Sequence, residues 1–223
     1  MSSKDVREAP SYTFAEASRY LRVPAPTVRV WVVGLHGERQ QFEPLIRRPD
    51  SRDKRLSFNN LVEIHVLRAL RTQHGVPMKF VRQALREAED QFGIPRLLIH
   101  KELSAAPGRM FLDRYGQLVD LTRSGQLALK DIFRSYLRAV VCDPQGVPVR
   151  LYPWIPARFE GPSKSIYIDP YRAFGAPVAG RRGISTAVLA SRIDAGESVA
   201  SVASDYGLES GEVEEAIRFE RAA

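Results

Sequence analysis

The run of residues 14–33 constrains the fold more than any other, because it has the pattern of two helices joined by a stiff turn. Thr13 and Glu16 have the spacing of a capping box, which predicts that the first helix begins at residue 14. Two prolines in residues 24–26 interrupt the helical pattern, and residues 27–33 predict a second helix. The expected motif is a helix-turn-helix.

The two expected helices have an apolar side and a basic side. Val28 and Trp31 lie three residues apart and predict the buried stripe of the second helix. Arg22, Thr27 and Arg29 fall on the opposite side, where a helix that enters the major groove needs donors. A helical hairpin in an ordinary core has the same spacing, so the spacing alone leaves both interpretations open.

A basic segment follows the second helix. Short apolar runs at residues 45–46 and 56–58 are expected to be strands, which would form a two-stranded wing with a basic tip. The cations of this segment are Arg39, Arg47, Arg48, Arg52, Lys54 and Arg55. We expect them to contact DNA phosphates together with the helix-turn-helix residues.

Two more helices are expected after the wing, over residues 61–71 and 78–90, and a Gly-x-Pro turn separates them. Asn59 and Asn60 are expected to cap the first of them. This order resembles the DNA-binding domain of MerR-type regulators, and the resemblance covers residues 12–92. It departs from that family's pattern in the proline-rich turn and in an enlarged wing. The resemblance implies operator DNA as a partner.

The charge distribution agrees with this placement of the DNA contacts. The chain has 223 residues and a formal net charge of +7. Residues 1–92 hold 16 Lys/Arg against 11 Asp/Glu, whereas residues 161–223 hold 7 against 9. Basic excess attracts phosphate over a long, salt-screened range, and here it coincides with the predicted helix-turn-helix and wing. The alternative is a solvated basic surface without a ligand.

Residues 93–152 are expected to form a β-rich module with two hairpins, over residues 109–122 and 139–152, and one helix over residues 126–137. The single cysteine, Cys142, ends an apolar strand and is expected in the core. The module has no catalytic constellation, which favours a role in spacing or dimerisation. The Pro- and Gly-rich residues 153–165 are expected to be a linker.

The last segment, residues 166–221, contains the motifs I-x-I-D-P, I-S-T-x-V-L, A-G-E-S-V and D-Y-G-L. Together they resemble a small homeodomain-like family, long catalogued as a domain of unknown function and often assigned to VapB-type antitoxins. With the MerR-like head, the whole chain resembles a VapB-type antitoxin of a type II toxin–antitoxin pair. That resemblance implies a PIN-like ribonuclease toxin as partner, a hetero-oligomer with it, and autorepression of the operon.

The tail also has the pattern of a second helix-turn-helix. Four of its positions match the first motif at a constant offset of 185, namely Ala203, Gly207, Leu208 and Val213 with Ser18, Arg22, Val23 and Val28. The helix that would enter DNA carries five glutamates, which phosphates repel: Glu209, Glu212, Glu214, Glu215 and Glu220. We therefore expect the first motif to bind DNA and the second to make protein contacts.

The toxin contact is expected to be made by arginine, because a PIN-type toxin has an acidic metal-binding site. The candidates are Arg158 in the linker and Arg181 and Arg182 in a glycine-flanked loop. An exposed turn without a specific role explains the last two equally well.

No enzyme chemistry, metal or cofactor is expected, because the four histidines are scattered and have no Cys/His ligand spacing. One cysteine, no membrane-length apolar run and no signal-like N-terminus favour a cytoplasmic protein without a membrane contact. The expected fold class is α+β and mainly helical, and the expected assembly on a palindromic operator is a homodimer. Two alternatives remain open: a free-standing MerR-like regulator without a toxin, and a structural adaptor.

Overall fold

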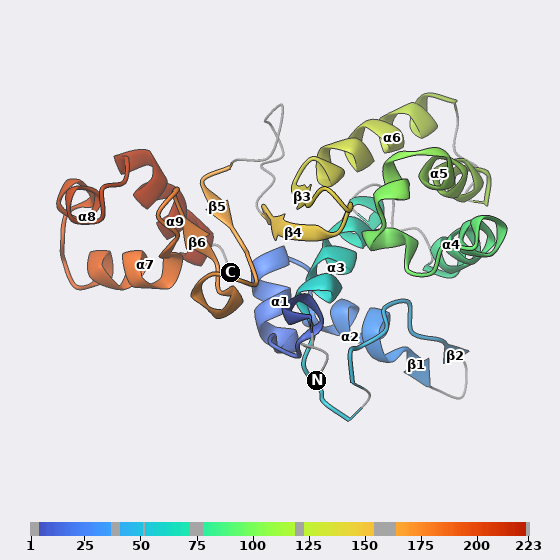
Figure 1. The fold of residues 1–223 in the computed structure, drawn as a ribbon, viewed down its shortest axis with the longest axis horizontal. Helices are drawn as coiled ribbons and strands as arrows, with labels where there is room; N and C mark the ends of the chain where they lie inside the picture. Colours follow the sequence, from blue (N-terminus) through green and yellow to red (C-terminus); the bar gives the residue numbers. More distant parts are fainter. Residues whose placement is uncertain are drawn as a thin grey trace.

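The computed structural model describes residues 5–36, 41–50, 52–71, 78–118, 123–153 and 164–221. In this part the chain is mainly helical, with three small antiparallel sheets. Figure 1 shows the helices of the C-terminal domain on one side, α1 to α3 in the centre, and α4 to α6 on the other side. The α+β, mainly helical class predicted from the sequence is confirmed.

The first helix-turn-helix forms as the sequence predicts. Helix α1 (Phe14–Leu21) begins at a complete capping box, in which Thr13 and Glu16 each accept from the other's backbone N–H. Arg22 ends this helix in the left-handed region, with φ 52°. Helix α2 (Ala25–Val33) has Pro24 at its N-cap position and begins two residues earlier than expected.

The strands of the predicted wing lie elsewhere than expected. The hairpin pairs β1 (Leu35–His36) with β2 (Gln41–Phe42), so residues 45–46 and 56–58 do not pair with each other. The N–H groups of Leu45 and Ile46 instead donate to the carbonyl oxygen of Trp31, at 2.8 and 3.0 Å. The last carbonyl oxygens of a helix find no donor within the helix. These two N–H groups supply donors to one such carbonyl of α2, that of Trp31.

Two long helices follow, α3 (Phe58–Arg71) and α4 (Met78–Phe92). The capping residue of α3 is Ser57 and not Asn59 or Asn60, because Asn60 N–H donates to Ser57 Oγ at 3.2 Å. The Asn60 Oδ1 accepts from Ser57 N–H at 3.1 Å, which completes the cap. The buried residues of α3 form the centre of the core, and they include Leu61, Ile64, Leu67 and Leu70.

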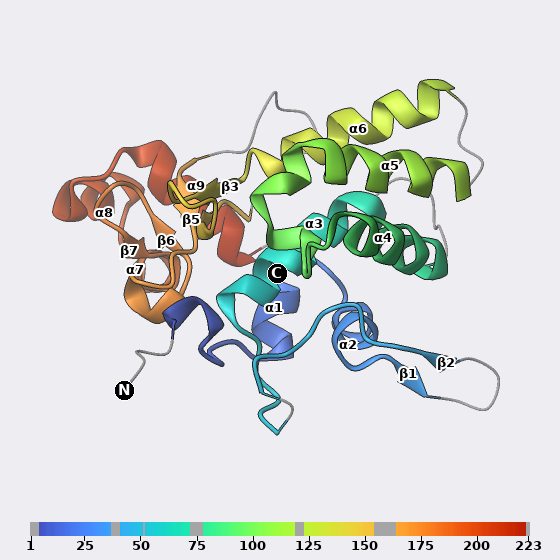
Figure 2. The same cartoon turned by 45° about the vertical axis from the view of Figure 1, so that its right-hand side comes forward.

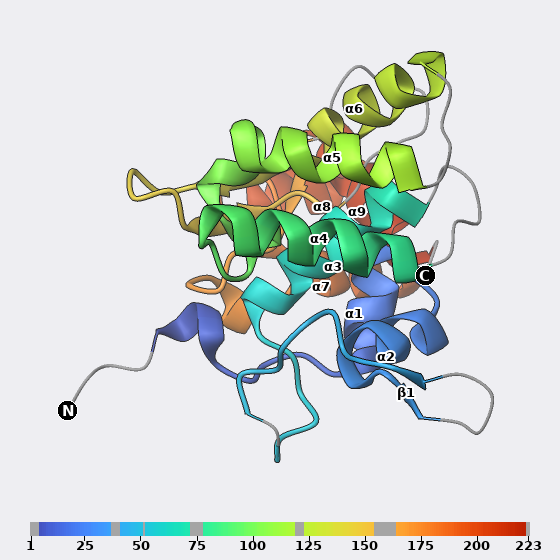
Figure 3. The same ribbon diagram turned by 90° about the vertical axis from the view of Figure 1, so that its right-hand side faces the viewer.

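The middle of the chain is more helical than predicted. Two 3₁₀ turns, η2 (Leu97–Ile99) and η3 (Lys101–Ser104), lead into α5 (Ala106–Leu118), and α6 (Arg123–Leu137) follows. The predicted hairpin over residues 109–122 is therefore wrong for residues 109–118, and residues 119–122 lie outside the described part. Figure 3 shows α5 running alongside α4.

The glycine in the middle of this predicted hairpin lies in a helix and not in a turn. Gly116 lies inside α5, where an added Cβ would meet Gln126 Cγ of α6 at 3.1 Å. It therefore marks a close approach between helices and not a turn. The second hairpin is confirmed, since β3 (Val140–Cys142) pairs with β4 (Pro148–Leu151). The prediction of a buried Cys142 is wrong, because Cys142 is exposed on the outer strand of this hairpin.

The C-terminal domain combines a three-stranded sheet with three helices. The strands are β5 (Ile166–Tyr167), β6 (Val178–Ala179) and β7 (Ile184–Ser185), and a 3₁₀ turn, η4 (Ala173–Gly175), lies before β6. The helices are α7 (Thr186–Asp194), α8 (Val199–Tyr206) and α9 (Ser210–Arg221). A bridge between Leu151 and Ile168 joins this domain to β4.

Candidate nucleic-acid interface

The exposed side of α2 is the first component of the candidate interface. Val28 and Trp31 are fully buried, as the sequence predicts, and fix the helix on the core. Thr27 is half-buried and Arg29 is exposed on the other side. The Arg29 guanidinium makes no hydrogen bond or ion pair with any described residue, so its donors are available to a ligand.

A basic loop, residues 47–55, is the second component. Two aspartates shape it from within: Asp50 Oδ1 accepts from Arg52 N–H at 2.8 Å, and Asp53 Oδ1 accepts from Arg55 N–H at 2.8 Å. Arg48 Nη1 donates to the Asp53 carbonyl oxygen at 2.8 Å. The side chain of Arg48 is therefore used to hold the loop together.

Both ends of this loop are anchored to the core. Asn60 Nδ2 donates to the Arg47 carbonyl oxygen at 2.9 Å. At the other end, Leu56 forms an antiparallel bridge with Tyr12, and Leu56 N–H donates to the Tyr12 carbonyl oxygen at 2.7 Å. A loop held at both ends presents its tip at a defined place relative to α2.

The cations of the loop differ in whether an aspartate already pairs with them. Arg47, Arg52 and Lys54 are exposed and make no ion pair with a described residue. Arg55 pairs with Asp53 at 2.8 Å, and this hydrogen bond lowers the pKa of the Asp53 carboxyl. Arg39 lies outside the described residues.

The hairpin, the loop and α2 lie at the same edge of the molecule. Figures 1 and 2 both show the β1–β2 hairpin and the loop before α3 extending from the lower edge, with α2 beside them. An exposed helix beside a hairpin and a basic loop is the arrangement that winged helix-turn-helix proteins present to a major groove and its phosphates.

Arg22 is placed differently from the other predicted DNA residues. Its Nη2 donates to the Phe219 carbonyl oxygen of α9 at 3.0 Å, and its guanidinium lies 5.8 Å from the centre of the Phe219 ring. Burial at this contact lowers the pKa of Arg22. The residue that ends α1 thus links the first helix-turn-helix to the last helix of the chain.

Two further contacts join α1 to α9. The rings of Tyr20 and Phe219 stack with their centroids 6.4 Å apart. Arg19 Nη1 pairs with Glu220 Oε2 at 3.1 Å, and Glu220 also accepts from the Thr186 hydroxyl. The last helix of the second helix-turn-helix therefore packs on the first helix-turn-helix of the same chain.

The two helix-turn-helix motifs end their first helices in the same way. Gly207 at the end of α8 has φ 60°, close to the 52° of Arg22. Leu208 N–H donates to the Ala203 carbonyl oxygen at 2.9 Å, and Val23 N–H donates to the Ser18 carbonyl oxygen at 3.2 Å. These bonds close the same left-handed cap in both motifs. The residues that match at an offset of 185 therefore end the first helix of each motif with the same geometry.

The two predicted toxin-contact residues that the structure describes, Arg181 and Arg182, have different surroundings. Arg181 is exposed, and its carbonyl oxygen accepts from Arg172 Nη1 at 3.4 Å. Arg182 is exposed as well, but its Nη1 donates to the Tyr206 carbonyl oxygen at 3.2 Å. Arg158 lies outside the described residues.

The sequence reasoning missed an exposed aromatic turn near Arg181. Phe174 has its whole side chain in solvent, at 102% relative exposure, and Tyr171 is 65% exposed. Ala173 and Phe174 both adopt positive φ, at 45° and 54°, which is costly for residues with a Cβ. The sequence does show two aromatic residues in a loop, Tyr171 and Phe174. Large aromatic residues are more often buried than exposed, so the sequence alone does not predict their exposure.

No cluster of three or more His, Cys, Asp or Glu residues that could hold a metal ion occurs among the residues that the structure describes. A search of the same residues for a helix long and apolar enough to cross a membrane finds none.

Two segments match known families. Residues 10–85 match a family described as "Putative DNA-binding HTH domain", and residues 166–219 match one described as "Protein of unknown function (DUF433)". The X-ray crystal structure of Rv2018 from Mycobacterium tuberculosis has the same fold, with a TM-score of 0.70 and 25% sequence identity over 94% of this chain and 97% of that chain.

Two relatives in sequence span nearly the whole chain. The "Uncharacterized protein Rv2308" of M. tuberculosis is 24% identical over 98% of this chain and 93% of its own length. The "Putative antitoxin VapB45" of M. tuberculosis is 30% identical over 94% of this chain and 93% of its own length. The chain therefore belongs to the family of the "Putative antitoxin VapB45", and its residues 10–85 match a helix-turn-helix DNA-binding domain.

Proposed function

We propose that the protein is a cytoplasmic antitoxin that binds and neutralises a PIN-like ribonuclease toxin and represses its own operon as a homodimer. The first helix-turn-helix reads the operator, and the C-terminal domain contacts the toxin. The antitoxin and helix-turn-helix relatives favour such a regulator over an enzyme. One observation supports this division of roles most strongly: Arg29 and the basic loop are exposed at one edge of the molecule, whereas α9 contacts α1 through Phe219 and Glu220.

On the DNA side, the proposal assigns two kinds of contact. Arg29 and Thr27 on α2 reach base edges and specify sequence, while Arg47, Arg52 and Lys54 neutralise phosphates. Arg39, Arg48 and Arg55 belong to the same basic segment. Arg22 stabilises the helix-turn-helix through its contact with Phe219 of α9.

On the toxin side, the proposal assigns the contact to the surface around Arg181. Its guanidinium suits the acidic metal-binding site of a PIN-like toxin, because a planar fork pairs with carboxylates bidentately. Tyr171 and Phe174 supply exposed aromatic anchors on the neighbouring turn, and such residues dominate the energy of many interfaces. Arg182 is a further candidate at this surface, and Arg158, which lies outside the described residues, remains a candidate from the sequence.

The direct test is to co-express the chain with the product of its adjacent reading frame, with a tag on only one of them. The expected result is a stable complex that shifts operator DNA at physiological salt. A chain that binds operator DNA alone and captures no partner would support the free-standing MerR-like regulator instead. A chain that binds no DNA would point to the adaptor.

The toxin surface is tested separately with Arg181→Glu and Phe174→Ser. Both side chains are exposed, so these variants should fold normally. Each is expected to weaken toxin binding at least tenfold and to leave operator binding unchanged. Arg218→Glu on the outer side of α9 is the matched control. If the Arg181→Glu variant still neutralised the toxin fully, Arg181 would not be part of the toxin contact.

A further inference from the structure

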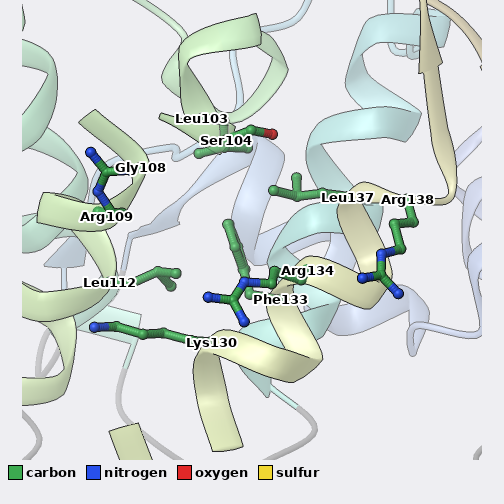
Figure 4. A pocket seen from close by; sticks show the side chains of 10 residues that line it. All are labelled: Leu103, Ser104, Gly108, Arg109, Leu112, Lys130, Phe133, Arg134, Leu137 and Arg138. Atoms are coloured by element: carbon green, nitrogen blue, oxygen red, sulfur yellow. The ribbon is translucent and has the colours of Figure 1, made fainter. Parts of the chain in front are cut away.

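A groove between α5, α6 and η3 has no part in the proposed function. It has a volume of about 350 Å³. One wall comes from the first half of α5, with Gly108, Arg109 and Leu112. The other comes from the last two turns of α6, and Figure 4 shows side chains of both helices around the same space. Its volume lies at the lower end of the range for small-molecule pockets.

The floor of the groove is apolar and recessed. Leu103, Leu112 and Phe133 line it, and they are 5%, 7% and 1% exposed. Phe133 is held in place by Phe111 on α5, with ring centroids 6.1 Å apart. A flat protein surface cannot reach such a floor, whereas a narrow aliphatic chain can enter between the helices.

Cations surround this floor. Four of the lining residues are basic: Arg109, Lys130, Arg134 and Arg138. Lys130 pairs with Asp113 at 2.6 Å, and Arg134 pairs with Asp131 at 2.8 Å. The exposed guanidinium groups of Arg109 and Arg138 make no hydrogen bond or ion pair with any described residue. Figure 4 shows them on either side of the groove.

We propose that this groove binds an anionic amphiphile, an aliphatic chain that ends in a carboxylate or phosphate. The chain lies on Leu103, Leu112 and Phe133, where it is removed from water. The anionic group lies at the mouth, where Arg109 and Arg138 supply donors that the protein itself does not use. The apolar floor of the groove thus matches the aliphatic chain of such a molecule, and the basic mouth matches its anionic group.

The groove lies next to the DNA-binding domain, because α6 packs on α3. Tyr136, beside the lining residue Leu137, packs on α3, and its carbonyl oxygen lies 3.2 Å from His65 Nε2. The two rings lie 5.0 Å apart, and Arg68 of α3 lies over the Tyr136 ring at 5.9 Å. Helix α3 in turn packs on α1. The groove thus occupies one face of a helix whose other face is part of the core of the DNA-binding domain.

The test is titration calorimetry of the full chain with laurate, kept below its micelle-forming concentration. Two probes serve as comparisons: butyrate, which has the same head and almost no chain, and dodecyltrimethylammonium, which has the same chain length and the opposite charge. We expect laurate to bind at one site per chain, and the other two to bind at least tenfold more weakly. Equal binding of the cationic and anionic probes would overturn the proposal.

The site is assigned with the double variant Arg109→Gln/Arg138→Gln. Loss of two charge-assisted contacts is expected to weaken laurate binding at least tenfold. Arg218→Gln, an exposed cation on α9, is the matched control and should bind laurate as the parent does. Thermal melts verify that both variants are folded. Undiminished binding by the folded double variant, or a dimer that closes the groove to laurate, would refute the assignment.

Discussion

Arg22 Nη2 donates to the Phe219 carbonyl oxygen at 3.0 Å, so the left-handed cap of the first helix-turn-helix is fastened to the last helix of the chain. These two residues are 197 positions apart in sequence. The contact joins the DNA-binding domain to the domain to which we assign the toxin contact. A partner that moves α9 would therefore act directly on the turn that positions α2.

Two substitutions at Arg22 separate its side-chain contacts from its backbone conformation. Arg22→Ala removes the contacts with Phe219 and keeps a Cβ at φ 52°, whereas Arg22→Gly removes the contacts and relieves the left-handed strain. We expect both to destabilise the chain, and Arg22→Gly to do so by about 1 kcal/mol less. Urea unfolding measures the difference. Equal loss in the two variants would mean that the backbone at residue 22 carries no strain.

Arg29 and Arg52 are expected to affect DNA binding in different ways. Arg29→Ala should weaken specific operator binding by about 1–3 kcal/mol and relax the preference at one base pair. Arg52→Ala should weaken binding to all sequences alike and reduce the salt slope by about 1. Binding isotherms at several salt concentrations separate the two effects, with Arg134→Ala on α6 as a control. If Arg29→Ala weakened binding to all DNA sequences alike, Arg29 would contact a phosphate and not a base edge.

Arg48→Ala is expected to differ from Arg52→Ala, although both residues lie in the same basic loop. The Arg48 side chain holds the Asp53 carbonyl oxygen, so its removal should loosen residues 47–55. The expected result is weaker DNA binding together with increased proteolysis within the loop, which Arg52→Ala should not cause. Identical proteolysis of the two variants would show that Arg48 does not support the loop.

The parts of the fold that local chemistry determines could be predicted from the sequence. The Thr13 capping box and the offset of 185 between Arg22 and Gly207 identify both helix-turn-helix motifs, because caps and turn residues act over a few positions. The prediction of a hairpin over residues 109–122 is wrong because Gly116 does not form a turn. It lies in α5, at a place where Gln126 of α6 leaves little room for a side chain. The groove could not be predicted either, since its lining comes from η3, α5 and α6, which meet only in the folded chain.

The pH dependence of stability is expected to contain a contribution from His65. The imidazole is fully buried between α3 and α6, its Nδ1 has no hydrogen-bond partner among the described residues, and burial lowers its pKa from 6.5 to about 3. Between these two values the unfolded chain binds a proton that the folded chain does not. The free energy of unfolding should therefore fall by up to about 1.4 kcal/mol per pH unit as the pH drops below about 6.5.

His65→Gln tests this contribution, because an amide can still donate to the Tyr136 carbonyl oxygen but does not titrate. From pH 6.5 to pH 5 the variant should lose about 1.7 kcal/mol less stability than the parent chain. Urea unfolding at both pH values measures this, and His100→Gln at the exposed N-terminal side of η3 is the control. The same pH slope in His65→Gln and the parent would show that His65 is protonated in the folded chain.

Two glycines near the second helix-turn-helix should respond in opposite ways to alanine. Gly207 has φ 60°, and an added Cβ would lie 2.8 Å from Cζ of Arg182. Gly207→Ala is therefore expected to cost about 1–2 kcal/mol of stability from the left-handed backbone, plus the displacement of Arg182. Gly211 lies in the first turn of α9 with nothing within 4 Å of an added Cβ. Gly211→Ala should be neutral or stabilising by up to about 0.5 kcal/mol.

Adding Arg182→Ala to Gly207→Ala separates the crowding from the backbone strain. The double variant should regain part of the loss, because the guanidinium no longer occupies the space of the new methyl group, but it should stay below the parent by the cost of the left-handed backbone. Thermal unfolding of the parent, Gly207→Ala, Arg182→Ala and the double variant measures the cost of the crowding and the cost of the backbone separately. If Gly207→Ala were as stable as Gly211→Ala, the second motif would close its turn without the left-handed cap that it shares with Arg22.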